Sequence, residues 1–148
     1  MNKKTKKIIL ITVVAIIVIA AITGYMMWNK PHKDVRDADA VKITAVDLYN
    51  IFITDSSKAK SSYTDKVVLV SGEVNHISQN QQAQQIILIK TAVNGAFINC
   101  TMEEKAVDCK VGDKVIIKGI CSGYIAGDAD MGLPGDVFLV RGYLSTEK

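Results

Sequence analysis

Two hydrophobic patterns of different period divide this chain. Residues 8–28 form an unbroken uncharged run, whereas short runs from residue 66 onward alternate apolar and polar positions. A continuous apolar run without a polar face predicts a helix that is buried or embedded in a membrane. Alternation with period two predicts strands that are buried on one face. We therefore expect an apolar N-terminal helix followed by a separate, mainly β domain.

The apolar run Ile8–Trp28 has 21 residues, about the length that a helix needs to cross a bilayer core. Four lysines within residues 1–7 precede it, and such charges hold a short N-terminus in the cytoplasm. A cleavable signal peptide is the alternative, but its apolar region is usually shorter and ends in small residues. Here residues 25–28 prolong the apolar run beyond Gly24. We therefore predict a single-pass, uncleaved signal anchor in the bacterial cytoplasmic membrane, with the N-terminus in the cytoplasm and the domain in the periplasm or outside.

Charge is distributed unevenly along the chain. The net charge is +3 at neutral pH, but the four lysines before the apolar run alone supply +4. Residues 29–42 are mostly polar, and we expect a linker there, followed by a domain over residues 43–148. Residues 29–148 carry 14 Lys and Arg against 15 Asp and Glu. A domain that follows a phosphate backbone normally shows a basic stripe, so the charge argues against nucleic acid.

A short helix should open the domain. Thr44 is a candidate N-cap with Asp47 three residues later, and apolar residues follow at helical spacing. Asp55 and two serines after it weaken the pattern, so we expect the helix to break before Lys58. We interpret the apolar stripe as core packing; it consists of Ala45, Leu48, Tyr49 and Phe52.

Five strands are predicted after the helix. A glutamine-rich loop over residues 78–85 and an Asn-Gly turn at residues 94–95 separate the first three. The charged residues 103–111 are compatible with one or two helical turns between the third and fourth strands. The predicted strands are residues 66–77, 85–91, 96–102, 113–124 and 136–145, and their inward-facing candidates are Val68, Val70, Ile87, Ile98, Val115, Ile117 and Leu139.

The number and spacing of these strands favour an OB fold, a small five-stranded Greek-key barrel. Gly72 and Gly119 lie inside the first and fourth strands, where glycine allows a barrel strand to bend. An SH3-like barrel or a small sandwich would also fit five strands, but the long first strand with its internal glycine favours the OB fold. The expected fold class is mainly β, a five-stranded Greek-key OB-fold barrel with a preceding α-helix, plus an N-terminal transmembrane helix.

Several stretches resemble a known family. They include Y-x-x-K-V-x-x-V-x-G-x-V over residues 63–74 and G-D-K-V-x-x-K-G-x-C over residues 112–121, together with TAVDLYNIF, FINCTM and DVFLVRGYL. These segments are similar to the tRNA-anticodon-binding-like OB-fold family of small bacterial exported proteins, many of them lipoproteins or membrane-anchored. The resemblance covers residues 44–145 and implies the barrel fold. It carries no catalytic motif, and the family name implies no tRNA binding.

Residues with metal-binding or catalytic chemistry are sparse. The spacings of Cys100, Cys109 and Cys121 match neither a zinc ribbon nor a thioredoxin-like motif. Cys100 and Cys121 could both face the barrel interior, so a disulfide between them and two buried thiols are equal alternatives. The acidic loop over residues 126–135 lacks the ligand pattern of an EF-hand. We therefore predict no metal, no cofactor and no catalytic residue.

Two function classes fit these observations. The first is a membrane-tethered, extracytoplasmic binding module without catalytic activity. It takes a glycan, peptide or protein across the second and third strands and the flanking loops, residues 76–85 and 124–135. The alternative is a single-stranded nucleic-acid-binding OB-fold protein, which needs aromatic and cationic side chains on that face. Those strands supply only one candidate of each kind, so nucleic acid is the less favoured partner. The candidate ligand face consists of His76, Gln81, Gln82, Lys90, Phe97 and Tyr124.

Overall fold

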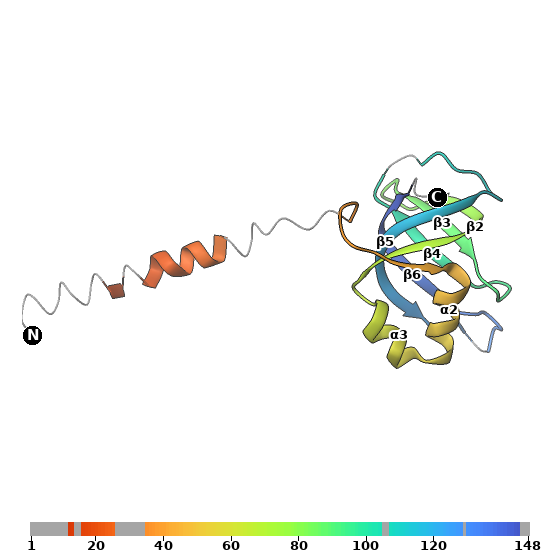
Figure 1. Cartoon of the computed structure of the whole chain (residues 1–148), viewed down its shortest axis with the longest axis horizontal. Coiled ribbons are helices and arrows are strands. Elements are labelled where there is room, and N and C mark those ends of the chain that lie inside the picture. The colour runs from red at the N-terminus through yellow and green to blue at the C-terminus, as the bar shows by residue number, and fades with distance from the viewer. Residues whose placement is uncertain (1–11, 14–15, 26–34, 105–106, 129, 146–148) are drawn as a thin grey trace, which may run out of the picture. The chain divides into compact units, whose positions relative to one another are not determined.

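The computed structural model describes residues 12–13, 16–25, 35–104, 107–128 and 130–145. It divides into two compact units, Met1–Lys33 and Asp34–Lys148. In the first unit, residues 16–25 are helical (Figure 1). Within the described ranges, no helix is both long and apolar enough to cross a membrane. Part of the predicted anchor, all of residues 1–7 and residues 29–34 lie outside those ranges.

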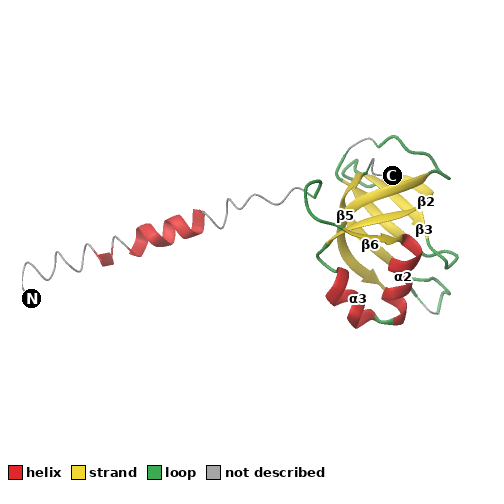
Figure 2. Cartoon of the chain, in the orientation of Figure 1, coloured by secondary structure: helices red, strands yellow, loops and turns green. Residues whose placement is uncertain are grey.

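Within its described residues, the second unit combines six strands with two helices (Figure 2). All five predicted strands are present, and their ends agree with the predicted ends to within about two residues. In chain order the elements are β1 (Val41–Thr44), α2 (Ala45–Thr54), α3 (Ser56–Tyr63), β2 (Val67–Gln79), β3 (Gln85–Lys90), β4 (Phe97–Met102), β5 (Lys114–Ile125) and β6 (Asp136–Leu144).

Strands β2 to β6 close into a barrel because β2 is long enough to pair with two neighbours. Its first part, Val67–Glu73, pairs with β5, and its second part, Val74–Gln79, pairs with β3. The sheet continues from β3 to β4, and a parallel pairing of β4 with β6 and an antiparallel pairing of β6 with β5 complete the circle. This closed five-stranded barrel is consistent with the OB fold.

The barrel interior is apolar and agrees with the alternation in the sequence. All seven predicted inward-facing residues are buried, and the apolar stripe of α2 is buried with them. Thr44 caps α2 as predicted: its hydroxyl accepts from the Asp47 amide at 3.1 Å and donates to the Asp47 carboxylate at 2.7 Å. The predicted break falls at Asp55, whose carboxylate accepts from the Lys58 amide at 3.0 Å and so caps α3.

The strand β1 was not predicted. It lies at the end of the segment that the sequence assigned to a linker, and it pairs in parallel with β2, with Val41 opposite Val68. Val35 is also buried, at 1% exposure. The predicted domain start at residue 43 is therefore too late, because the contacts that order residues 35–42 come from strands far along the chain.

The connection between β4 and β5 also differs from the prediction. Its described residues, 103–104 and 107–111, form no helix. Val107 is buried, and its amide donates to the side-chain carbonyl of Gln85 at 2.7 Å. This contact holds the connection against β3 and satisfies a backbone group without a helical turn. The apolar helix that packs against the barrel core is α2, which precedes the barrel strands in sequence as predicted.

Candidate ligand-binding face

Strict alternation along β3 and β4 separates an inner from an outer face. Inward residues of these strands, such as Ile87 and Ile98, are completely buried. Outward residues are partly or fully exposed, because nothing in the described chain packs over them as the core does on the inside. The outer set is Ile86, Leu88 and Lys90 on β3 and Phe97, Asn99 and Thr101 on β4.

The strand registers align one outward row across four strands. His76 of β2 lies opposite Leu88, Leu88 opposite Asn99, and Asn99 opposite Phe138 of β6. At a strand spacing of about 4.8 Å, this row extends over roughly 15 Å. His76 is exposed and the other three residues are half-buried. The row thus alternates hydrogen-bonding side chains, an imidazole and a carboxamide, with hydrocarbon side chains.

Lys90 and Phe97 form a second, adjacent row, since the two residues pair directly. The Lys90 ammonium makes an ion pair with Glu73, and both side chains are more than 40% exposed, so the pair stabilises the fold little. The Phe97 amide donates to the Asp136 carboxylate at 2.8 Å, which fixes the start of β4. Burial raises the pKa of Asp136, and this hydrogen bond opposes the shift.

The two predicted glutamines lie at the tip of the β2–β3 loop. Gln81 and Gln82 are exposed, and neither belongs to a strand. Asn80 shapes the loop, because its side-chain oxygen accepts from the amides of Gln82 and Gln84, both at 2.9 Å. This loop follows directly on β2, so it borders the outer face without forming part of its rows.

Tyr124 is the predicted site residue that the structure places elsewhere. Its ring packs against two residues of α2, with centroid distances of 6.1 Å to Tyr49 and 6.3 Å to Phe52. Burial is the main cause that raises the pKa of Tyr49, and the neighbouring Tyr124 raises it further. The structure therefore brings His76, Lys90 and Phe97 together and gives Tyr124 a packing role against α2.

The cysteines are free. Cys100 on β4 and Cys121 on β5 both lie opposite Leu139, which places the whole of β6 between them. Two strand spacings separate their backbones by about 9–10 Å, beyond the reach of a disulfide. Burial raises the pKa of Cys100, and burial also raises the pKa of Cys121 to about 11, so both are protonated thiols at neutral pH. Among the described residues, no group of His, Cys, Asp or Glu could hold a metal ion.

Several outer-face residues escaped the sequence analysis. Asn99 could have been found, since alternation in FINCTM places it on the same side as Phe97. Leu88 could have been found in the same way. Phe138 could not, because only the parallel pairing of β4 with β6 brings it beside Asn99.

Comparison with known proteins adds a family and little else. No curated protein matches the sequence. Among solved structures, OBody AM3L09 bound to hen egg-white lysozyme is 18% identical with a TM-score of 0.34, covering 60% of this chain and 93% of that chain. OBody AM3L15 bound to hen egg-white lysozyme is 19% identical with a TM-score of 0.33, covering 60% and 88%. These similarities are too low to support an argument about the ligand. The family comparison is decisive: residues 1–131 match the tRNA_anti-like family, and the chain belongs to it.

Proposed function

We propose that this chain is a membrane-tethered, extracytoplasmic OB-fold binding module without catalytic activity. Its ligand, a glycan, peptide or protein surface, binds across the outer face of β3 and β4. The observation that carries the proposal is the aligned row of His76, Leu88, Asn99 and Phe138.

The chemistry of this row suits a polar ligand with apolar patches. The Asn99 carboxamide and the His76 imidazole can donate and accept hydrogen bonds, as hydroxyls and peptide groups require. Leu88 and Phe138 offer hydrocarbon surface beside these groups, and such a mixture is typical of specific binding sites. Lys90, the strand cation next to this row, already pairs with Glu73, so the face offers little to a phosphate backbone.

The N-terminal helix supports the tether. Within residues 16–25 the large apolar side chains are exposed, including Ile16, Ile19 and Ile22 at more than 50%. The hydroxyl of Thr23 donates to the carbonyls of Ile19 and Ala20 at 2.9 and 3.0 Å. The hydrogen-bond donor of this polar side chain is therefore satisfied within the helix. Internal satisfaction of polar groups is what a lipid environment demands. The family match also begins at residue 1 and so includes this segment.

A cysteine at the loop tip would test the topology. In a Cys109→Ser background, we expect Gln81→Cys to react with a membrane-impermeant maleimide in intact spheroplasts, because residue 81 is exposed on the exported domain. In the same background, Asn2→Cys is the matched control for the cytoplasmic side and should react only after lysis. Labelling of Gln81→Cys only after lysis would contradict the proposed orientation, and recovery of a soluble product lacking the apolar run would contradict the anchor.

A binding experiment would test the outer face. The full chain in detergent is titrated with soluble peptidoglycan fragments, which present both glycan and peptide, and separately with an oligothymidylate. We expect His76→Ala/Asn99→Ala to bind the fragments about tenfold more weakly than the wild type, the loss typical of truncating central contacts. Ser57→Ala, exposed on α3, is the control and should bind like the wild type.

Two outcomes would contradict this assignment. Equal binding by the double variant and the wild type would place the ligand away from the outer face. Tighter binding of the oligothymidylate, with an affinity that falls steeply as salt increases, would replace the proposal by single-stranded nucleic-acid binding.

A further inference from the structure

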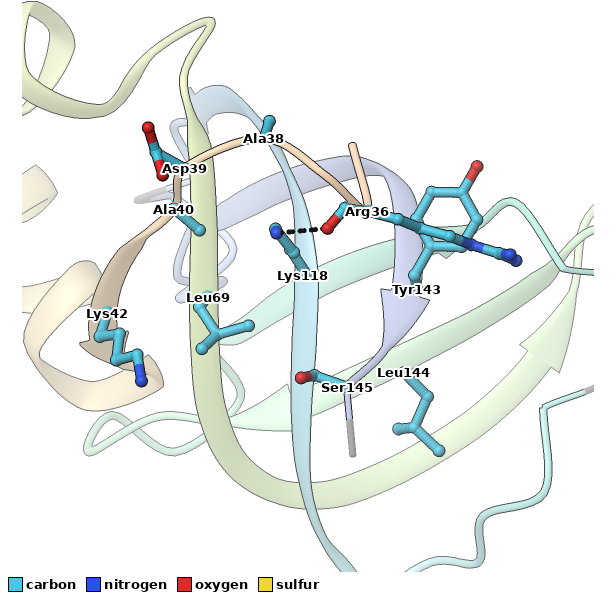
Figure 3. A pocket seen from close by; sticks show the side chains of 10 residues that line it. All are labelled: Arg36, Ala38, Asp39, Ala40, Lys42, Leu69, Lys118, Tyr143, Leu144 and Ser145. Carbon is cyan, nitrogen blue, oxygen red and sulfur yellow. Dashed lines mark hydrogen bonds between the residues drawn. The ribbon is translucent and has the colours of Figure 1, made fainter. Parts of the chain in front are cut away.

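A groove of about 460 Å³ lies on another part of the barrel surface, between residues 36–42 and strands β2, β5 and β6 (Figure 3). It shares no residue with the outer face of β3 and β4, although the row on that face also includes one residue each of β2 and β6. Its volume falls within the range of small-molecule sites. Residues that are far apart in the sequence form it, so no local motif could have indicated it.

The strand registers explain how the groove acquires its charge. Lys42 of β1 lies opposite Leu69, Leu69 opposite Lys118 of β5, and Lys118 opposite Tyr143 of β6. Two lysines therefore flank one apolar side chain, with their backbones about 9–10 Å apart. Leu69 is only 6% exposed and forms the floor. Figure 3 shows the Lys42 ammonium and the Ser145 hydroxyl on either side of it.

Contacts within the wall hold the groove in shape before any ligand arrives. The Lys118 ammonium donates to the backbone carbonyl of Arg36 at 2.7 Å. The Arg36 guanidinium lies over the Tyr143 ring, 4.4 Å from its centroid, and makes an ion pair with Glu104. An ammonium has three donors, so Lys118 keeps donors for a ligand while it holds the chain segment.

The local charge differs from that of the rest of the domain. Residues 34–148 contain 12 Lys and Arg against 15 Asp and Glu. Among the described residues that line the groove, Arg36, Lys42 and Lys118 are cationic and Asp39 is acidic, and Arg36 pairs with Glu104, which is not one of those lining residues. Two other surface pockets each balance one lysine with one aspartate, Lys60 with Asp65 and Lys58 with Asp55. Even with Arg36 paired, the described lining of this groove contains two lysines and one aspartate, whereas the described linings of those two pockets contain one of each.

We propose that this groove binds the phosphate group of a small phosphoester, held by Lys42, Lys118 and the Ser145 hydroxyl, with the ester's apolar part over Leu69. Lysine ammonium groups act as mobile point charges that suit phosphate, and hydroxyls donate to its oxygens. The phosphate can come from a soluble phosphoester or from the headgroup of an anionic lipid, and the chemistry of recognition is the same in both cases.

The test uses the full chain in phosphatidylcholine nanodiscs. Glycerol phosphate is titrated while the amide shift of Tyr143 is followed by NMR. We expect saturable binding that Lys42→Gln/Lys118→Gln weakens about tenfold or more, as loss of charge-assisted contacts does. Lys110→Gln/Lys114→Gln removes the same charge from exposed positions elsewhere and should weaken binding less than about twofold.

A second arm distinguishes the source of the phosphate. Hydrogen exchange of residues 36–42 is compared between nanodiscs with and without phosphatidylglycerol, in the absence of glycerol phosphate. If protection from exchange requires phosphatidylglycerol and is lost in the double variant, the phosphate comes from the lipid headgroup. If glycerol phosphate binds but phosphatidylglycerol gives no protection, the phosphate comes from a soluble ester.

The single variant Lys42→Gln keeps the hydrogen bond from Lys118 to Arg36, so it tests the site even if the double variant is unfolded. Three results would overturn the proposal: no response to either probe, equal losses in the two double variants, or unchanged binding by Lys42→Gln. The outer face of β3 and β4 shares no residue with this groove, so failure here leaves the proposed function standing.

Discussion

Replacing Phe52 by alanine is expected to destabilise the domain by about 3–5 kcal/mol, the usual cost of truncating a fully buried aromatic residue. Among the described residues, Phe52 is the largest side chain with less than 2% exposure, at 1%. It joins α2 to the barrel core and stacks on Tyr124 of β5. The cavity left by the substitution would therefore separate the helix from the sheet. Urea unfolding of residues 34–148, followed by circular dichroism, measures the loss.

The neighbouring residue is the matched control. Ile53 lies on the same helix but is 48% exposed, so Ile53→Ala should change the free energy of unfolding by less than about 0.5 kcal/mol. If both substitutions had the same small effect, α2 would not be part of the core, and the assignment of its buried face would be wrong.

Gly72→Val should have an effect of similar size for the opposite reason, since it adds atoms to a filled interior. A Cβ at residue 72 would overlap Cγ2 of Ile89 and lie 3.1 Å from Cβ of Ala45. Ile89 and Ala45 are both buried, so neither can move aside without disturbing the core. We expect a loss of about 3 kcal/mol, at the upper end of the range for overpacking.

Two further substitutions, with smaller expected losses of unfolding free energy, serve as comparisons for Gly72→Val. At Gly119 the nearest atom to a Cβ is the Val140 carbonyl oxygen, at 3.2 Å, so Gly119→Val should cost less, about 1–3 kcal/mol. Gln81→Ala in the exposed β2–β3 loop should cost less than about 0.5 kcal/mol. If thermal unfolding showed the largest loss of stability for Gln81→Ala among the three variants, the strand assignment would be contradicted.

Much of the barrel could be predicted because its residues obey local rules. Alternation in β2 to β6 separates buried from exposed positions, and each strand has one face against a common core. Likewise Thr44 and Asp55 mark helix boundaries through contacts within three residues of themselves. Such signals depend on neighbours in the sequence, so the sequence alone contains them.

The candidate face was predictable only in part. Alternation gives the outward direction of Phe97 and Lys90 but not their neighbours across the sheet. The row from His76 to Phe138 depends on the register between strands that are up to 62 positions apart in the chain. The surroundings of Tyr124 could not be predicted for a related reason: its strand is correct, but the helix that contacts its ring begins 79 residues earlier.

Local patterns of residues were enough to predict the apolar N-terminal run, the order of the strands along the chain, the inner face of the barrel and the family. Strand pairing in the folded chain sets the place of β1, the separation of Cys100 from Cys121 by β6, and the row of Lys42, Leu69 and Lys118. Hydrophobic periodicity indicates on which face of its own strand each side chain lies. It contains no information on which strands become neighbours. The pairing of strands brings together the rows of the outer face and the residues that line the groove between residues 36–42 and strands β2, β5 and β6.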